Sequence, residues 1–259
     1  MKEVERLELR RQGDTVAIAG DYQYKALRSS NPVQRSWHRS KPISISELMP
    51  PSPGDFVLDV GCGSGAVSDY LESLGARVLG VDANEQAVRF ASETFVRPGR
   101  NLRFECRLVE DVSLENESVD KIYCLELIEH IYLKQIEALL ACFHRLLKPG
   151  GMVFLTTPNY RSHWPLVEWT MDRLHLAPPM EEHQHVTRLD RRLVRQLLEN
   201  SGFRVEKLRT KCFLAPWTAL LSQDLSVWMH RKEMAREHPF GCVVVAVGRK
   251  APHTGSAAR

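Results

Sequence analysis

Short apolar runs alternate along this chain with segments in which apolar residues recur every three or four positions. The runs at 57–60, 76–81, 102–108, 119–125 and 152–157 predict buried strands. The segments between them, among them 66–74 and 131–147, have the spacing of amphipathic helices. Two further strand-like runs, at 203–210 and 241–249, follow a helix expected after Asp190. The alternation predicts an α/β protein whose sheet is mostly parallel.

Three glycines follow the first predicted strand at every second position. Gly61, Gly63 and Gly65 have no Cβ, so the backbone can adopt positive φ there and approach a bound molecule closely. A helix is expected to begin directly afterwards, with its N-terminus facing the same ligand. Asp82 ends the second predicted strand, where α/β proteins bind ribose hydroxyls. These features alone fit a dinucleotide as well as another nucleoside ligand.

Three separated motifs distinguish between these ligands. They are Leu58-Asp59-Val60-Gly61-Cys62-Gly63-Ser64-Gly65, Gly80-Val81-Asp82 and Leu147-Lys148-Pro149-Gly150-Gly151. In this order they resemble the class I S-adenosylmethionine (SAM)-dependent methyltransferases, over residues from about 56 to 250. The resemblance implies a Rossmann-like α/β sheet of seven strands, the last one antiparallel, with an N-terminal cap and lid-like helical insertions. It also implies SAM as the cofactor.

Pro50-Pro51-Ser52-Pro53-Gly54 separates the predicted core from the segment before it. We expect residues 1–50 to cap the cofactor pocket, with a plain surface helix as the alternative and a small hairpin within 1–20. Residues 51–250 then form the methyltransferase domain, with insertions at 159–188 and 211–240. Residues 251–259 are small and polar and are expected to form a flexible tail.

The resemblance also assigns the cofactor contacts. The glycine turn would hold the methionine end of SAM with Asp59 near its ammonium, Asp82 would take the ribose, and Asp111 with the Val112 backbone would take the adenine. For Asp111 an ordinary loop acid is the alternative. The residues expected to bind the cofactor are Asp59, Gly61, Cys62, Gly63, Gly65, Asp82, Ala83, Asp111, Val112 and Leu125.

Glu126-x-x-Glu129-His130 follows the fourth predicted strand. If a helix begins there, these three side chains share one face. With a later histidine, the motif resembles the ubiquinone-pathway type O-methyltransferases and the small-RNA 3′-terminal 2′-O-methyltransferases. In those branches such residues can hold a divalent metal that activates the acceptor hydroxyl. The candidate catalytic residues, and candidate ligands of Mg, Mn or Zn, are therefore Glu126, Glu129, His130 and His185, with His183 as a close alternative to His185.

A metal-free site is the alternative for the same residues. His130 or His185 could act as a general base without any metal. Glu129 would also stabilise the N-terminus of a helix whatever its function, and His130 could be a half-buried imidazole with hydrogen-bond partners.

The acceptor is expected to be a hydroxyl group of a small molecule. DNA is disfavoured because neither an Asn/Asp-Pro-Pro-Tyr motif nor a Pro-Cys dipeptide follows the fourth predicted strand. RNA 2′-O-methylation stays open, although the chain shows no sustained basic stripe. A nicotinamide (NAD(P))-dependent oxidoreductase would lack its Tyr-x-x-x-Lys pair, and a non-catalytic SAM-binding protein is a further alternative. The local basic cluster consists of Arg188, Arg191, Arg192 and Arg195.

Composition adds little that points to a partner. The formal net charge of +3 is too balanced to indicate nucleic acid by itself. Six cysteines without a Cys-x-x-Cys pair are typical of a reduced, cytoplasmic protein. An apolar stripe within 213–230 predicts core or lid packing, with a peripheral membrane contact as the alternative. Its members are Trp217, Leu220, Leu221, Leu225 and Trp228.

Overall fold

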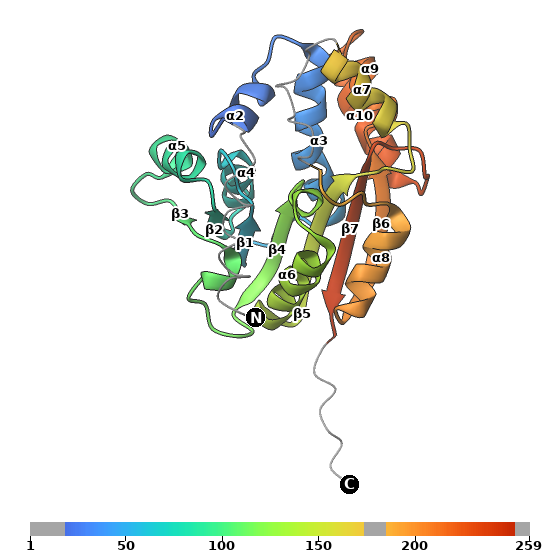
Figure 1. The fold of residues 1–259 in the computed structure, drawn as a ribbon. Helices are drawn as coiled ribbons and strands as arrows, with labels where there is room; N and C mark the ends of the chain where they lie inside the picture. The colour runs from blue at the N-terminus through green and yellow to red at the C-terminus, as the bar shows by residue number, and fades with distance from the viewer. Residues whose placement is uncertain (1–18, 174–184, 252–259) are drawn as a thin grey trace.

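The computed structural model describes residues 19–173 and 185–251, and its centre is a seven-stranded sheet (Figure 1). The strand order is β3-β2-β1-β4-β5-β7-β6, and β7 runs antiparallel to both of its neighbours. This confirms the predicted α/β sheet and its antiparallel last strand. The strands are β1 (Phe56–Val60), β2 (Arg77–Asp82), β3 (Leu102–Cys106), β4 (Val119–Leu125), β5 (Leu147–Pro158), β6 (Phe203–Lys211) and β7 (Val243–Lys250).

Helices cover both faces of the sheet, and each face has its own apolar cluster (Figure 1). One cluster joins the sheet to α6 and α8, with Phe143 fully buried. The other joins it to α3, α4 and α10, with Ile45 and Leu71 fully buried. The helices are α2 (Tyr22–Leu27), α3 (Pro32–Leu48), α4 (Ala66–Ser73), α5 (Glu85–Phe95), α6 (Leu133–Leu146), α7 (Trp164–Arg173), α8 (Arg191–Asn200), α9 (Ala215–Thr218) and α10 (Gln223–Ala235), with short 3-10 turns η1 (Val109–Asp111) and η2 (Ile128–His130).

Two helix starts lie where their capping residues predict them. The Asn84 side chain accepts hydrogen bonds from the Gln86 and Ala87 amides and begins α5. The Asp190 side chain accepts from the Leu193 amide at 2.8 Å and begins α8. Each such cap stabilises its helix by about 1 kcal/mol.

A helix does not begin at Glu126, so the condition for a shared helical face is not met. The Glu126 amide donates to the Thr156 carbonyl at 2.9 Å, so the pairing of β4 with β5 continues through this residue. Its φ of +55° then turns the chain out of the sheet, and only the 3-10 turn η2 follows before α6 begins at Leu133. Glu126, Glu129 and His130 therefore do not share a helical face.

The apolar stripe of 213–230 does not pack into the core, so only the lid half of the prediction stays open. Ser222 caps α10 and separates it from α9, and the inward face of α10 carries Ser226, His230 and Met234 instead. Ser36 of α3 hydrogen-bonds to His230 Nε2 at 3.0 Å, so the contact between α3 and α10 is partly polar. The stripe remains exposed at Trp217 (46%), Leu220 (64%), Leu221 (82%), Leu225 (37%) and Trp228 (52%).

The remaining predictions about the chain ends lie outside the described residues. These are the hairpin within 1–20, apart from its last two residues, and nearly all of the tail from 251. No helix within 19–173 or 185–251 is long and apolar enough to cross a membrane.

Candidate active site

The glycine turn lies between the end of β1 and the start of α4, and Asp82 holds it in place. All three glycines have positive φ, at +71°, +49° and +77° for Gly61, Gly63 and Gly65. One oxygen of the Asp82 carboxylate accepts the Gly63 amide at 2.8 Å, and the other accepts the Asn84 amide at 2.8 Å. The turn and the end of β2 are thus joined into one rigid edge.

Asp59 is a buried carboxyl directly below this turn, with 2% of its surface exposed. The Ser68 hydroxyl donates to it at 2.6 Å. Burial raises the pKa of Asp59 to about 7, with the nearby Asp82 carboxylate adding to the effect and Ser68 opposing it. A carboxyl with this pKa is poised to ionise when a cation binds beside it.

The other expected cofactor residues lie at the same edge of the sheet. Leu125 ends β4 and is buried, and Ala83 follows β2. Asp111 is exposed in η1, next to the buried Val112. Because the carboxyl ends of parallel strands meet at one edge, the residues expected to bind SAM gather there.

Helix α2 lies over the glycine turn. A Cβ added to Gly63 would be 3.2 Å from the side-chain nitrogen Nε2 of Gln23. Tyr24 of the same helix contacts the Phe90 ring edge to face, with 5.3 Å between the ring centroids. The side chain of Gln23 in α2 therefore lies directly against the glycine turn.

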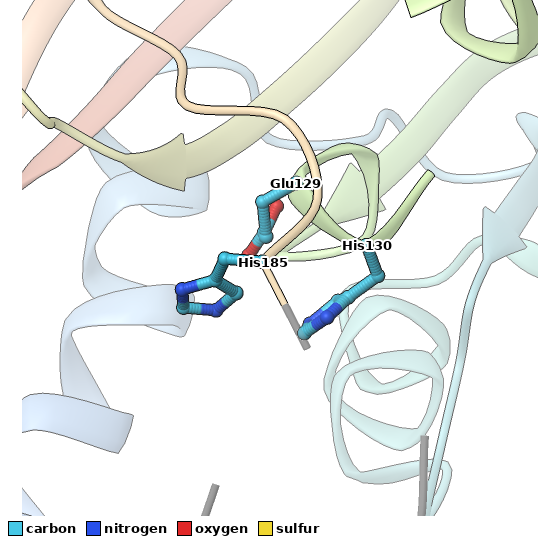
Figure 2. Close-up of side chains that lie close together, drawn as sticks. All are labelled: Glu129, His130 and His185. Carbon is cyan, nitrogen blue, oxygen red and sulfur yellow. The ribbon is translucent and has the colours of Figure 1, made fainter. Parts of the chain in front are cut away.

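Glu129, His130 and His185 come together beside this edge, and Figure 2 shows their side chains converging from two segments of the chain. One ligand atom from each lies within 4.8 Å of the others. The two imidazole rings have centroids 5.0 Å apart. Glu129 is 1% exposed, and the Thr157 hydroxyl donates to its carboxylate at 3.1 Å.

Backbone contacts bring the segment of His185 to η2. The Thr187 amide donates to the Glu129 carbonyl at 3.1 Å, and the Thr187 hydroxyl donates to the Ile131 carbonyl at 2.6 Å. The Tyr160 hydroxyl lies 2.7 Å from His185 Nδ1. Thr187 belongs to no motif, so its role could not be found from the sequence. His183 lies outside the described residues.

Burial sets the protonation of Glu129. Desolvation raises its pKa to about 7, the Glu126 charge adds to the rise, and His185 opposes it. A carboxyl of this kind can accept or release a proton near neutral pH.

Glu126 does not belong to this group of three. One of its carboxylate oxygens lies 2.8 Å from the Lys41 ammonium of α3. Burial alone would raise the pKa of Glu126, but the Lys41 and Lys211 charges lower it to about 2. Of the four candidate ligands, Glu129, His130 and His185 thus lie close together, whereas Glu126 has Lys41 as its ionic partner. Lys41 was visible in the sequence only as one polar residue among several in the predicted cap.

The arginine cluster is also less regular than expected. Helix α8 begins at Arg191, so Arg188 lies before it and does not share a helical face with the others. The Arg188 guanidinium lies 5.7 Å from the centre of the Tyr160 ring. Arg195 pairs with Glu199 at 3.7 Å, as on an ordinary solvated helix face.

The comparison with protein families shows to which family the chain belongs. Residues 38–208 match a family model described as a methyltransferase domain. This stretch contains the glycine turn, Asp82 and the group of Glu129, His130 and His185. The chain belongs to the SAM-dependent methyltransferases. The resemblance predicted from the three motifs is thereby confirmed.

Individual relatives of this methyltransferase agree with the family. It is 30% identical over 167 residues to the ubiquinone biosynthesis O-methyltransferase of Idiomarina loihiensis, covering 64% of this chain and 65% of that protein. It is 28% identical to the protein of the same name from Sinorhizobium fredii, covering 79% and 84%. The first match thus spans less than two thirds of the relative's length.

A solved structure shares the fold. A chain of the complex between the Haloferax volcanii Trm112 methyltransferase activator and a methyltransferase superposes with a TM-score of 0.61 at 23% identity, covering 92% of this chain and 99% of that one. The family supports SAM as the cofactor. The comparisons give no support to a metal, an RNA acceptor or a nicotinamide cofactor.

Proposed function

We propose that this methyltransferase transfers the methyl group of SAM to a hydroxyl group of a small molecule. The observation that carries the proposal is the buried Glu129 carboxyl beside His130 and His185, at the edge of the sheet where SAM is expected. A carboxylate or an imidazole can remove the proton of an acceptor hydroxyl as a general base. The O-methyltransferase names of the relatives support the same acceptor chemistry.

The cofactor residues fit SAM by their chemistry. Asp59 and Asp82 are carboxylates that suit an ammonium group and ribose hydroxyls, and the glycines leave room for close approach. When bound, SAM supplies a methyl group made electrophilic by its positive sulfur. We retain residues 1–50 as a cap and 51–250 as the catalytic domain, which the position of Gln23 over Gly63 supports.

We assign proton removal to His185. Its Nδ1 atom lies 2.7 Å from the Tyr160 hydroxyl, which holds the imidazole in one orientation beside Glu129. The buried Glu129 carboxylate then stabilises the imidazolium that forms, and Thr157 holds that carboxylate by a hydrogen bond. His130, whose ring is 5.0 Å away, is the alternative base.

The same three residues also suit a divalent cation. One carboxylate and two imidazoles form a donor set found for zinc and manganese, and their ligand atoms are already within 4.8 Å of one another. Such an ion would polarise the acceptor hydroxyl. Glu126 is not included, since it pairs with Lys41.

The test is transfer of tritium from methyl-labelled SAM to hydroxylated small molecules, with catechol as the first probe. The proposal expects labelled product with the native enzyme, and a loss of at least about a hundredfold in turnover for His185→Ala. Chelator treatment followed by added magnesium, manganese or zinc tests the cation. Transfer to RNA without transfer to any small hydroxyl compound would refute the proposed acceptor.

A lipid surface is a second candidate partner, favoured by the exposed stripe on α9, on α10 and on the turn between them. Leu221 is 82% exposed and Trp217 is 46% exposed, and tryptophan favours the interface of a bilayer. Co-sedimentation with phosphatidylcholine–phosphatidylglycerol vesicles should occur for the native chain and weaken for Leu221→Ser. Sedimentation that is absent, or unchanged in the variant, would refute this contact.

We place the enzyme in the cytoplasm. All six cysteines lie in described segments and are free, which supports a reducing compartment.

A further inference from the structure

Three arginines, Arg161, Arg188 and Arg191, lie near the candidate base His185, and the proposed function gives them no role. The Arg188 guanidinium lies 5.7 Å from the centre of the Tyr160 ring, and the Tyr160 hydroxyl lies 2.7 Å from His185 Nδ1. Arg188 is exposed and follows His185 by three residues. A single aromatic side chain therefore connects this cation to the imidazole to which we assign proton removal.

Arg161 brings a second guanidinium to the same segment. The Tyr160 amide donates to the Leu189 carbonyl at 2.9 Å, which fixes the residue before Arg161 beside the residue after Arg188. The Arg161 side chain is 73% exposed, and its Nη1 lies 3.7 Å from the Asp190 carboxylate. Two exposed guanidinium groups thus flank one backbone contact close to the candidate base.

The carboxylates of the described residues do not balance this positive charge. Asp190 pairs with Arg161 only, and its other oxygen accepts the Leu193 amide at 2.8 Å as the cap of α8. Neither Arg188 nor Arg191 has a carboxylate within 4.0 Å in the parts of the chain that the structure describes. Arg191 Nε is also buried without a hydrogen-bond partner among residues 19–173 and 185–251. An unpaired buried donor costs about 1 to 3 kcal/mol, so an anion bound here would be stabilising.

We propose that the acceptor carries an anionic group, a carboxylate or a phosphate, which Arg188 binds while the acceptor hydroxyl meets His185. The inference rests on the proposed function, because it takes the acceptor to be a hydroxylated small molecule. The planar fork of N–H donors on a guanidinium matches the oxygens of both anions. Arg161 offers a second fork to the same anion. An anion held beside Tyr160 would fix which hydroxyl of the acceptor reaches the base.

The test compares an acidic acceptor with its neutral amide. Methyl transfer from labelled SAM is measured to 3,4-dihydroxyphenylacetate and to 3,4-dihydroxyphenylacetamide, which share their hydroxyl groups and nearly share their shape. The ratio of their kcat/KM values therefore isolates the charge. The native enzyme should prefer the acid about tenfold, the low end for a charged hydrogen bond because Arg188 is exposed. A third acceptor, 3,4-dihydroxybenzylphosphonate, separates the two anions, since the one with the higher kcat/KM is the one that the site fits better.

Variants then assign the preference to a residue. Arg188→Met should reduce the preference for the acid to within about twofold while leaving kcat/KM for the amide within about twofold of the native value. Arg188→Glu should reverse the preference, because like charges repel. Arg195→Met is the matched control, since Arg195 belongs to the same basic cluster but pairs with Glu199 at 3.7 Å, and it should keep the native preference. The native preference should also shrink when the salt concentration rises from about 0.05 M to about 0.5 M.

Three results would overturn the assignment. The first is a native enzyme that prefers neither anion over the amide, including one that methylates catechol alone. The second is a preference that persists in Arg188→Met, and the third is an equal loss in Arg195→Met. If the native enzyme methylates none of these compounds, catechol included, the proposed function itself fails, which is a different outcome from these three.

Discussion

Asp59→Asn should make the protein more stable, and increasingly so as the pH rises. The carboxyl is fully buried under the glycine turn and has a pKa of about 7 against an ordinary value of 3.8. Because its folded-state pKa is raised, the folded protein binds more protons than the unfolded chain between these two values. The stability of the native protein therefore falls as pH rises through this window, and the full cost remains above about pH 7.

The size of this effect follows from the pKa. At about 1.4 kcal/mol for each tenfold change in proton affinity, the rise from 3.8 to about 7 amounts to about 4 kcal/mol. Roughly half of this cost is already present at about pH 5.5. Asparagine cannot ionise and still accepts the Ser68 hydroxyl, so the gap between variant and native protein should widen by about 2 kcal/mol between about pH 5.5 and pH 8.5.

Urea unfolding at both pH values, followed by tryptophan fluorescence, measures the gap. Asp120→Asn is the control with the opposite sign. Burial would raise the pKa of Asp120, but Lys148 at 2.7 Å and the Phe56 amide lower it, so that variant should lose stability at neutral pH. A gap for Asp59→Asn that does not change with pH, or that closes at high pH, would refute the argument.

Three further changes test the site and its support. His185→Gln should lower turnover at least about a hundredfold while leaving the affinity for S-adenosylhomocysteine unchanged, as measured by steady-state kinetics and calorimetry; equal loss of both would mean a structural role. Thr187→Val removes the hydroxyl that holds the Ile131 carbonyl at 2.6 Å, and should cost about 1 kcal/mol in unfolding free energy with a larger loss of turnover. Gly65→Ala should lower the free energy of unfolding by about 2 to 4 kcal/mol, since the residue has positive φ and an added Cβ would lie 2.7 Å from Phe104. Gly99→Ala is its control, because Gly99 has positive φ but open space around it, and it should lower the free energy of unfolding by about 1 to 2 kcal/mol. Equal losses for the two variants would contradict the steric argument.

The sheet could be predicted from local pattern because each strand and helix carries its own signal. Asn84 and Asp190 begin their helices as predicted, since a capping side chain acts within three residues of itself. The glycine turn and Asp82 could be placed because each directly follows or ends a strand that its own apolar run predicts.

The arrangement around Glu126 could not be predicted, because it depends on contacts far along the chain. Its amide continues the ladder to Thr156, and its carboxylate pairs with Lys41, which lies before the first strand. The shared face depended on a helix beginning at Glu126, and the pairing of β4 with β5 does not allow one. The exposure of Leu225 and Trp228 could not be predicted for a similar reason, since a polar contact through His230 helps to decide which side of α10 faces inward.

The most direct test of the central claim is calorimetric titration of the purified, chelator-treated protein with S-adenosylhomocysteine and, separately, with NADH. We predict saturable one-to-one binding of S-adenosylhomocysteine and no binding of NADH. Absence of S-adenosylhomocysteine binding, or binding of NADH in its place, would contradict the assignment of the glycine turn to SAM.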